Sequence, residues 1–361
     1  MSWLSSVQAV SPAEVLAIVM LLGLVAYALL GGADYGAGVW DLLARGPRAE
    51  AQREVIAHAI GPVWEANHVW LIIVVTLLFS AFPLAFSAIM TTLHVPLSLM
   101  LIGVVLRGSA FTFRSYDNTE VGKHRWNRLF SIPSVVTPVL LGIVVGAIAT
   151  GEPGRAAADA LESGRAVPLF ATWLRPFPIV VGVFTLNIFA FLAAVYLTLE
   201  TDDRGLREDF RRRALAAAVA LGAVAWVVYL LARAEAPIVF RGLDASPWGT
   251  PVRMATGGFA VATIAALWSR HYHVARVSAM VQVALILWGC ALAEYPYILP
   301  PNLTIAEAAS PPIVQKVLLV ALSAGSVVLL PSILYMFRVF KGHTFYLARV
   351  RASREAEERG G

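Results

Sequence analysis

The chain has 361 residues, of which 58% are hydrophobic and only 14% are charged. Soluble proteins carry about 25% charged residues, so this composition excludes an ordinary soluble domain and predicts a polytopic membrane protein. Cys290 is the single cysteine, which excludes an intrachain disulfide, a cysteine-based zinc site and a covalent c-type haem motif. The net charge of +5 does not indicate a nucleic-acid partner, because the basic residues follow the membrane topology.

Nine apolar runs approach the length of a spanning helix, which needs about 20 apolar residues. The first and last runs are longer than a bilayer requires, so we expect them to tilt or to extend past it. Pro83 closes the turn between the second and third runs. We therefore expect an all-α fold of about nine transmembrane helices. The runs cover residues 13–43, 55–79, 83–107, 130–150, 172–199, 214–233, 254–269, 274–294 and 312–340.

The loops between these runs differ strongly in charge. Of the 28 Lys and Arg residues, 21 fall in alternate loops and in the C-terminal segment, and seven fall on the opposite side. Cytoplasmic loops carry the excess of Lys and Arg, so the pattern predicts an outside N-terminus and a cytoplasmic C-terminus. It also predicts some affinity for anionic membrane lipid.

No connecting loop is long enough to form a separate soluble domain. The longest outside loops, about 151–171 and 234–253, are rich in Gly, Pro and Ala and have room only for short elements. We therefore expect one integral-membrane helical domain over residues 1–345, followed by a charged cytoplasmic tail over residues 346–361.

The first apolar run contains an acid inside a glycine-rich patch, residues 31–38, which read GGADYGAG. Small residues let membrane helices approach each other closely. Asp34 lies well inside this run, so we expect it either to line a polar path or to make a packing contact. Asp41 lies nearer the cytoplasmic end, and we interpret it as an ordinary interfacial acid.

The stretch from His58 to Trp70 places several polar groups inside a predicted span. A charged side chain in hydrocarbon costs roughly 2.5–3.5 kcal/mol on insertion scales. Glu65 and His68 are three residues apart and share a helix face, which predicts a buried proton or ligand site. Asn67 can orient either group, and Trp64 can pack around them. A satisfied polar contact between packed helices is the alternative interpretation.

Motifs of self-contained enzymes are absent. The sequence contains no P-loop, no His-Glu-x-x-His and no Gly-x-Ser-x-Gly. His271 and His273 are two residues apart and do not share a helix face, so they do not form a metal or haem pair there.

Several segments resemble subunit II of cytochrome bd-type quinol oxidases. Residues 29–38, LLGGADYGAG, are similar to the family's glycine- and aspartate-rich first-helix motif. Residues 60–72, IGPVWEANHVWLI, resemble its PxWDGNxxWL segment, and FSAFP follows at 79–83. Residues 107–114, RGSAFTFR, resemble its RGxAFxFR pattern. Residues 295–304, YPYILPPNLT, resemble the loop after its eighth helix.

The resemblance implies a role in a respiratory complex of a bacterial or archaeal cytoplasmic membrane. In this family a haem-bearing subunit I oxidises quinol and reduces dioxygen to water, and subunit II binds no haem of its own. Haem b, with haem d as a further candidate, is therefore expected in the partner. Acids of subunit II are implicated in bringing cytoplasmic protons toward the oxygen-reducing haem. By this resemblance Glu65, Asp34 and His68 form a proton pathway, supported by Trp64, Asn67 and Arg107, with no metal site in this chain.

The sequence departs from the family pattern near its acids. Gly31 stands where the first acid of the first-helix motif is expected, Glu65 replaces an Asp, and Ala66 replaces a Gly. His68 follows Asn67 at a variable position of the family pattern. We hypothesise that His68 partly replaces the lost acid.

Two other functions are compatible with the residues themselves. Intramembrane acids also mark transport routes, so a secondary transporter or channel that uses Asp34, Glu65 and His68 is the main alternative. A scaffold subunit whose polar residues only specify helix packing is the second. The order of the motifs and the lack of a visible internal repeat argue against a transporter.

Overall fold

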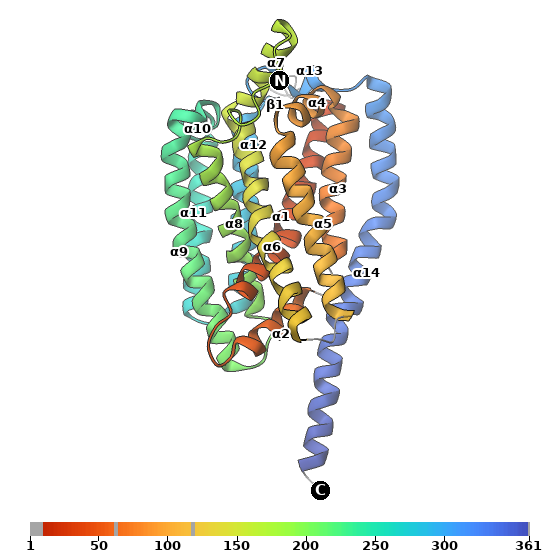
Figure 1. Ribbon diagram of the computed structural model, residues 1–361, viewed down its shortest axis with the longest axis vertical. Coiled ribbons are helices and arrows are strands. Elements are labelled where there is room, and N and C mark those ends of the chain that lie inside the picture. The colour runs from red at the N-terminus through yellow and green to blue at the C-terminus, as the bar shows by residue number, and fades with distance from the viewer. Residues whose placement is uncertain (1–9, 61–63, 117–119, 360–361) are drawn as a thin grey trace, which may run out of the picture.

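The computed structural model describes residues 10–60, 64–116 and 120–359, and almost all of them are helical. The helices run mainly parallel to one long axis and form a single bundle (Figure 1). The confirmed fold class is therefore all-α. In the first half of the chain the helices are α1 (Pro12–Leu42), α2 (Ala49–Ile60), α3 (Trp64–Ala81), α4 (Pro83–Thr92), α5 (His94–Tyr116), α6 (Glu120–Thr150) and α7 (Glu152–Ser163).

The second half continues the bundle and adds one small hairpin. β1 (Tyr297–Leu299) pairs antiparallel with β2 (Leu303–Thr304), directly after the eighth predicted run. The helices of this half are α8 (Pro176–Leu197), α9 (Arg204–Glu235), α10 (Pro237–Ala245), α11 (Gly249–Trp268), α12 (Tyr272–Glu294), α13 (Ile305–Ala308) and α14 (Pro312–Arg359).

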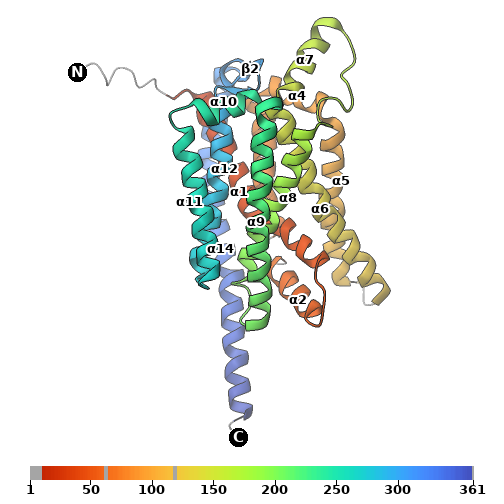
Figure 2. The same cartoon turned by 90° about the vertical axis from the view of Figure 1, so that its left-hand side faces the viewer.

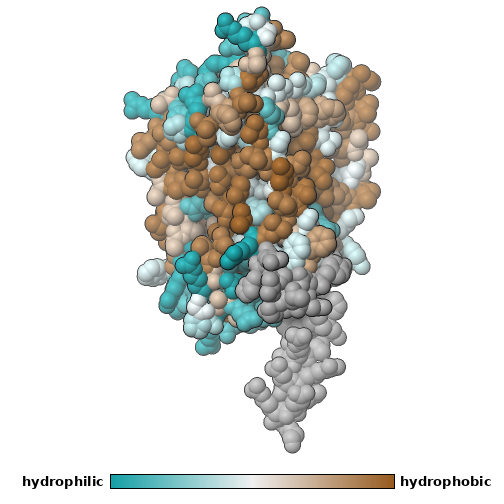
Figure 3. Space-filling model, viewed as in Figure 1, coloured by the Kyte–Doolittle hydropathy of each residue, from teal (hydrophilic) through white to brown (hydrophobic). Residues whose placement is uncertain are grey.

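In the described part of the chain, seven helices are long and apolar enough to cross a membrane, and α2 with α3 make an eighth span if the bent pair is counted as one. The seventh predicted run, 254–269, forms α11, a 20-residue helix that packs against α12 but is not among these spans. Each predicted run is thus helical, and the count of nine spans stays a prediction. On the face seen in Figure 3 a broad apolar band lies between more polar ends of the bundle, as expected for a chain embedded in a bilayer.

Two of the predicted runs are not single helices. The run 55–79 is divided between α2 and α3, which meet at an angle of 54°. The run 83–107 is divided between α4 and α5 at Leu93. Proline explains both divisions at the level of sequence, because its nitrogen cannot donate a helical hydrogen bond. Pro62, which lies outside the described residues, stands between α2 and α3, and Pro96 stands in the first turn of α5.

Helix α1 lies at the centre of the bundle and contacts α3, α6, α8 and α12. Its first turn is set by a capping box, in which the Ser11 hydroxyl accepts from the Glu14 N–H and the Glu14 carboxylate accepts from the Ser11 N–H. The glycine patch brings α8 close. A Cβ at Gly36 would overlap the Phe189 carbonyl, and one at Gly32 would lie 2.5 Å from the Phe189 ring. Only glycine allows this approach.

The two ends of the bundle differ in their connections. The short helices α7 and α10 and the hairpin lie at the end where α1 begins, whereas α2 and the charged start of α9 lie at the end of the C-terminus (Figures 1 and 2). This arrangement agrees with short elements in the two long outside loops. Helix α14 has 48 residues, or about 72 Å, and continues through the predicted tail to Arg359 without a break.

Candidate functional site

Two consecutive residues of α3 meet two consecutive residues of α1. The first contact joins Asn67 to Asp34, whose side chains are 3% and 6% exposed. The Asn67 Nδ2 donates to Asp34 Oδ2 at 2.6 Å, which is a short hydrogen bond. The bond stabilises the intramembrane carboxyl and ties α3 to α1.

The second contact joins His68 to Tyr35. The Tyr35 hydroxyl and His68 Nε2 are 3.4 Å apart, and the imidazole also lies edge-on to the Tyr27 ring, with 6.1 Å between ring centroids. Both tyrosines are buried. His68 is therefore oriented by α1, although its spacing from Glu65 alone would have aimed it toward that acid.

Glu65 does not join this cluster. Its side chain is exposed on the surface of the chain, whereas Asn67 is buried and His68 is half-buried against α1. The expectation of a buried Glu65 is therefore wrong for this chain alone. The physical reason is helix geometry: residues three apart are offset by about 60° around a helix, so His68 can face α1 while Glu65 faces outward. Trp64, expected to pack beside it, has a side chain outside the described residues.

Arg107 reaches the same cluster from α5. It is 1% exposed, its guanidinium carbon lies 4.5 Å from the Tyr35 ring centroid and 5.0 Å from that of Phe130, and its Nε donates to Ser134 Oγ at 3.1 Å. The Nη2 group has no hydrogen-bond acceptor among the described residues. The buried cation thus joins α1, α5 and α6 and lies beside the tyrosine that contacts His68.

Asp41 is not an ordinary interfacial acid. Its side chain is 2% exposed and accepts a hydrogen bond of 3.1 Å from the Ser131 hydroxyl of α6. The sequence prediction was wrong because the chain continues below Asp41 into α2, which covers the end of α1 that would otherwise face the membrane surface. Asp41 is therefore a second buried acid on α1, about two turns beyond Asp34.

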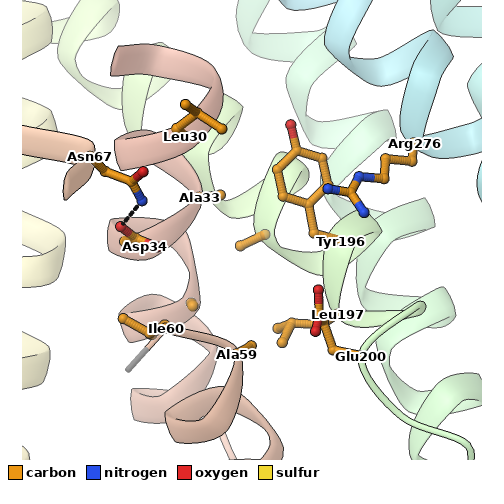
Figure 4. Close-up of a pocket in the computed structure, with 12 residues that line it drawn as sticks. Leu30, Ala33, Asp34, Ala59, Ile60, Asn67, Tyr196, Leu197, Glu200 and Arg276 are labelled. Carbon is orange, nitrogen blue, oxygen red and sulfur yellow. Dashed lines mark hydrogen bonds between the residues drawn. The ribbon is translucent and has the colours of Figure 1, made fainter. Parts of the chain in front are cut away.

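A pocket opens beside Asp34, on the side of α1 that faces α8 and α12 (Figure 4). Its volume of about 70 Å³ is room for several water molecules, which need roughly 10–15 Å³ each on this measure. Asp34 and Asn67 lie on one side and Tyr196, Glu200 and Arg276 on the other. The remaining lining is apolar: Leu30, Ala33, Ala37, Ala59, Ile60, Ala193 and Leu197.

Four members of this region were not predicted from the sequence: Tyr35, Tyr196, Glu200 and Arg276. Tyr35 lies within the glycine-rich motif, and its position directly after Asp34 was a usable signal. Arg276 and Glu200 read as ordinary loop-flanking charges, since each lies at the end of an apolar run. Only the tertiary structure brings the ends of α8 and α12 to α1.

Metal ligands do not gather in the described part of the chain. Within it no three His, Cys, Asp or Glu side chains are placed to hold a metal ion together. The polar groups around Asp34 are instead paired with amide, hydroxyl and aromatic groups, which suits the storage and transfer of protons.

Comparison with protein families gives one match across nearly the whole chain. The family described as cytochrome bd terminal oxidase subunit II matches residues 12–340. This range includes every helix of the candidate site, from α1 to α12.

Individual relatives are more distant. The chain is similar to the cytochrome bd-I ubiquinol oxidase subunit 2 of Escherichia coli K12, with 27% identity over 178 residues, 49% of this chain and 46% of that protein. It is also similar to the cytochrome bd ubiquinol oxidase subunit 2 of Bacillus subtilis, with 29% identity over 129 residues, 36% and 38% of the two chains. The matched part of this chain thus spans about half the length of these curated relatives or less.

A solved structure shares the fold more completely. A chain of the bd oxidase from Geobacillus thermodenitrificans superposes with a TM-score of 0.74, although only 22% of residues are identical. The superposition covers 91% of this chain and 98% of the other. The helical arrangement is therefore shared even where the sequences have diverged.

Proposed function

The chain belongs to the cytochrome bd terminal oxidase subunit II family, and from this we propose that it is the non-haem subunit of a membrane-bound quinol oxidase. It would partner a haem-bearing subunit that oxidises quinol and reduces dioxygen to water. The family match over residues 12–340 is the observation that carries this proposal. The haems supply the electron transfer and oxygen chemistry, and they belong to the partner.

This chain's own contribution is a proton supply. Reduction of dioxygen to water consumes protons, and a haem buried in a membrane receives them only along polar groups. The buried carboxyl of Asp34, held by the Asn67 amide, is such a group on the central helix. We assign Asp34 as a proton station, and His68 with the Tyr35 hydroxyl as a second polar branch beside it.

Glu65 has a different place in this proposal. An exposed carboxylate at the edge of a membrane span is unfavourable against lipid but favourable against a polar group of another protein. Glu65 therefore suits the transfer of a proton out of this chain, to the haem-bearing partner. Arg107 supports the branch by holding the Tyr35 ring in place.

The transporter alternative is not favoured. The family matches most of the chain, and the fold is shared with a chain of a bd oxidase. Both findings favour a role of the intramembrane acids in an oxidase complex. The same acids would otherwise be equally consistent with a transport route.

A gentle purification tests the complex itself. The tagged protein, extracted in mild detergent, is expected to bring a second subunit with it and to give a haem signal in a reduced-minus-oxidised spectrum. The preparation should consume oxygen when quinol is added. A stable, colourless protein that is purified alone and moves a solute across vesicles would contradict the proposal.

Asp34→Asn tests the proton supply. The amide keeps the shape of the side chain but cannot carry a proton, so quinol-dependent oxygen consumption should fall by about tenfold or more, with the haem content unchanged. Asp159→Asn, at an exposed acid of α7, is the matched control and should keep full activity. Normal turnover by Asp34→Asn with intact haems would exclude Asp34 as an essential station.

A further inference from the structure

Three charged side chains line the pocket: Asp34 on one side, and Glu200 and Arg276 on the other (Figure 4). Glu200 and Arg276 lie across the pocket from Asp34 and Asn67 (Figure 4). Glu200 follows the end of α8, two residues beyond its C-cap at Thr198, and Arg276 lies in the first turns of α12. Both helix ends are at the end of the bundle where α2 and the C-terminus lie (Figures 1 and 2), which the charge pattern predicts to be cytoplasmic.

The guanidinium of Arg276 is held in place by the ring of Tyr196. The Tyr196 hydroxyl donates to the Leu29 carbonyl of α1 at 3.2 Å, so its ring is tied to the central helix. The Arg276 guanidinium carbon lies 5.0 Å from the centroid of that ring. A guanidinium over an aromatic face is held by cation–π attraction, and Arg276 therefore keeps its charge at the pocket.

The carboxyl of Asp34 is reached from this pocket. Asp34 is buried, and it lines the pocket. Ala33, one residue before it, also lines the pocket. Three charged groups around a space of about 70 Å³ favour water over an empty cavity, because empty cavities in proteins are apolar.

We propose that this pocket is the water-filled cytoplasmic entrance of the proton path, with Glu200 as the group that collects protons and Arg276 as a fixed positive charge that balances the carboxyl groups of Glu200 and Asp34. The inference rests on the proposed function of Asp34. A proton bound at Glu200 moves through pocket water to the Asp34 carboxylate, and the net charge moved is one proton.

Thiol labelling tests the entrance without relying on turnover. Cys290 is the single cysteine of this chain, so Cys290→Ala gives a version of the chain without cysteine. In that background Ala59→Cys and Ala33→Cys place thiols at two positions of the pocket lining. Ala220→Cys, on the exposed apolar side of α9, is the control that faces hydrocarbon. Membranes that contain the complete oxidase are used throughout.

Both pocket cysteines should react with a membrane-impermeant methanethiosulfonate from the cytoplasmic side at least about tenfold faster than Ala220→Cys, because only a hydrated thiol ionises and reacts. The same reagent added to the outer side should leave Ala33→Cys unmodified. If the reagent added on the cytoplasmic side labels Ala33→Cys no faster than Ala220→Cys, the pocket is not a hydrated entrance and the proposal is wrong.

The role of Arg276 predicts a charge preference. Because Asp34 and Glu200 also line the pocket, the measured quantity is the ratio of the rates at which Ala33→Cys reacts with an anionic and with a cationic methanethiosulfonate. Arg276→Gln should lower this ratio by up to about tenfold, and Arg276→Lys should keep it. Loss of packing would slow or speed both reagents together, so an unchanged ratio in Arg276→Gln would overturn this part of the proposal.

Glu200→Gln tests proton collection. It should lower quinol-dependent proton uptake several-fold while the labelling of Ala33→Cys stays fast, and Glu200→Asp should restore uptake. Normal uptake in Glu200→Gln overturns the assignment of Glu200. If Asp34→Asn impairs turnover but Ala33→Cys is unreactive, the entrance fails and the proposed function stands. If Ala33→Cys reacts but Asp34→Asn is fully active, the pocket is hydrated and the proposed role of Asp34 as a proton station fails.

Discussion

The first and last spanning helices have nearly the same hydropathy but opposite surroundings. In the most apolar window of α1, 39% of the residues are buried inside the chain, whereas none are buried in the corresponding window of α14. Helix α1 lies at the centre, and α14 lies at the edge of the bundle (Figure 1). Hydropathy therefore identifies a membrane helix without revealing whether it faces lipid or protein.

The difference lies in small residues and in where polar groups bond. The glycines of α1 admit α8, and the Trp40 indole donates to the Ala190 carbonyl of α8 at 2.7 Å. In α14 the hydroxyls of Ser323, Ser326 and Ser332 donate to carbonyls of their own helix. Polar groups that bond across helices thus mark the central helix, and polar groups that bond within a helix mark the peripheral one.

The largest difference in stability between changes in α1 and in α14 is expected when a glycine is replaced. Gly36→Val would force a side chain into the backbone of α8 at Phe189, which should destabilise the complex by more than about 3 kcal/mol or prevent its assembly. Gly325→Val on α14, where a Cβ would meet no atom of the described chain within 4 Å, is the control and should be neutral. Thermal unfolding of the purified complexes, followed by circular dichroism, measures both; equal midpoints would contradict the tight α1–α8 contact.

Truncation of a leucine should give a smaller contrast. Leu16 of α1 is 0% exposed and belongs to one buried cluster with Leu77, Phe82 and Ala85, whereas Leu334 of α14 is 70% exposed. Leu16→Ala should cost about 2 kcal/mol, mainly through the cavity that it leaves. Leu334→Ala should cost little if α14 faces lipid, since lipid fills the space. A detergent denaturation titration compares the two, and a large loss for Leu334→Ala would show instead that a partner protein covers α14.

The smallest contrast concerns single hydrogen bonds. Trp40→Phe removes the bond to the Ala190 carbonyl and should cost about 0.6–1 kcal/mol, the usual range for such bonds between membrane helices. Ser326→Ala removes a bond within α14 and should change almost nothing. The rate of proteolysis at a fixed detergent concentration resolves differences of this size, and a greater loss for Ser326→Ala would reverse the comparison.

Much of the fold is readable from the sequence because lipid imposes simple rules. The apolar runs predicted helices at each of nine places, and the family resemblance is confirmed by the match over residues 12–340. The divisions of two runs were not predicted, although Pro62 and Pro96 were visible. Proline is tolerated inside other helices of this chain, such as α6 with Pro133 and Pro138, so its presence alone does not decide where a helix ends.

The candidate site was only partly readable. Asp34, Asn67 and His68 do lie together, since their motifs fall on the facing sides of α1 and α3. Glu65 was expected among them and lies outside, because a residue three positions away is still rotated around the helix. Arg276 and Glu200 gave no local signal at all, since their relation to Asp34 depends on how α8 and α12 end beside α1.

The sequence by itself thus determined the membrane class, the positions of the helical runs and the family, because each depends on composition or on residues close together in the chain. The orientation stays a prediction from the charge pattern. The tertiary structure alone decided that α1 is central and α14 peripheral, that Glu65 faces outward and that a pocket leads to Asp34. Those features depend on which helices touch, and contacts between distant helices are set by shape and packing rather than by hydropathy.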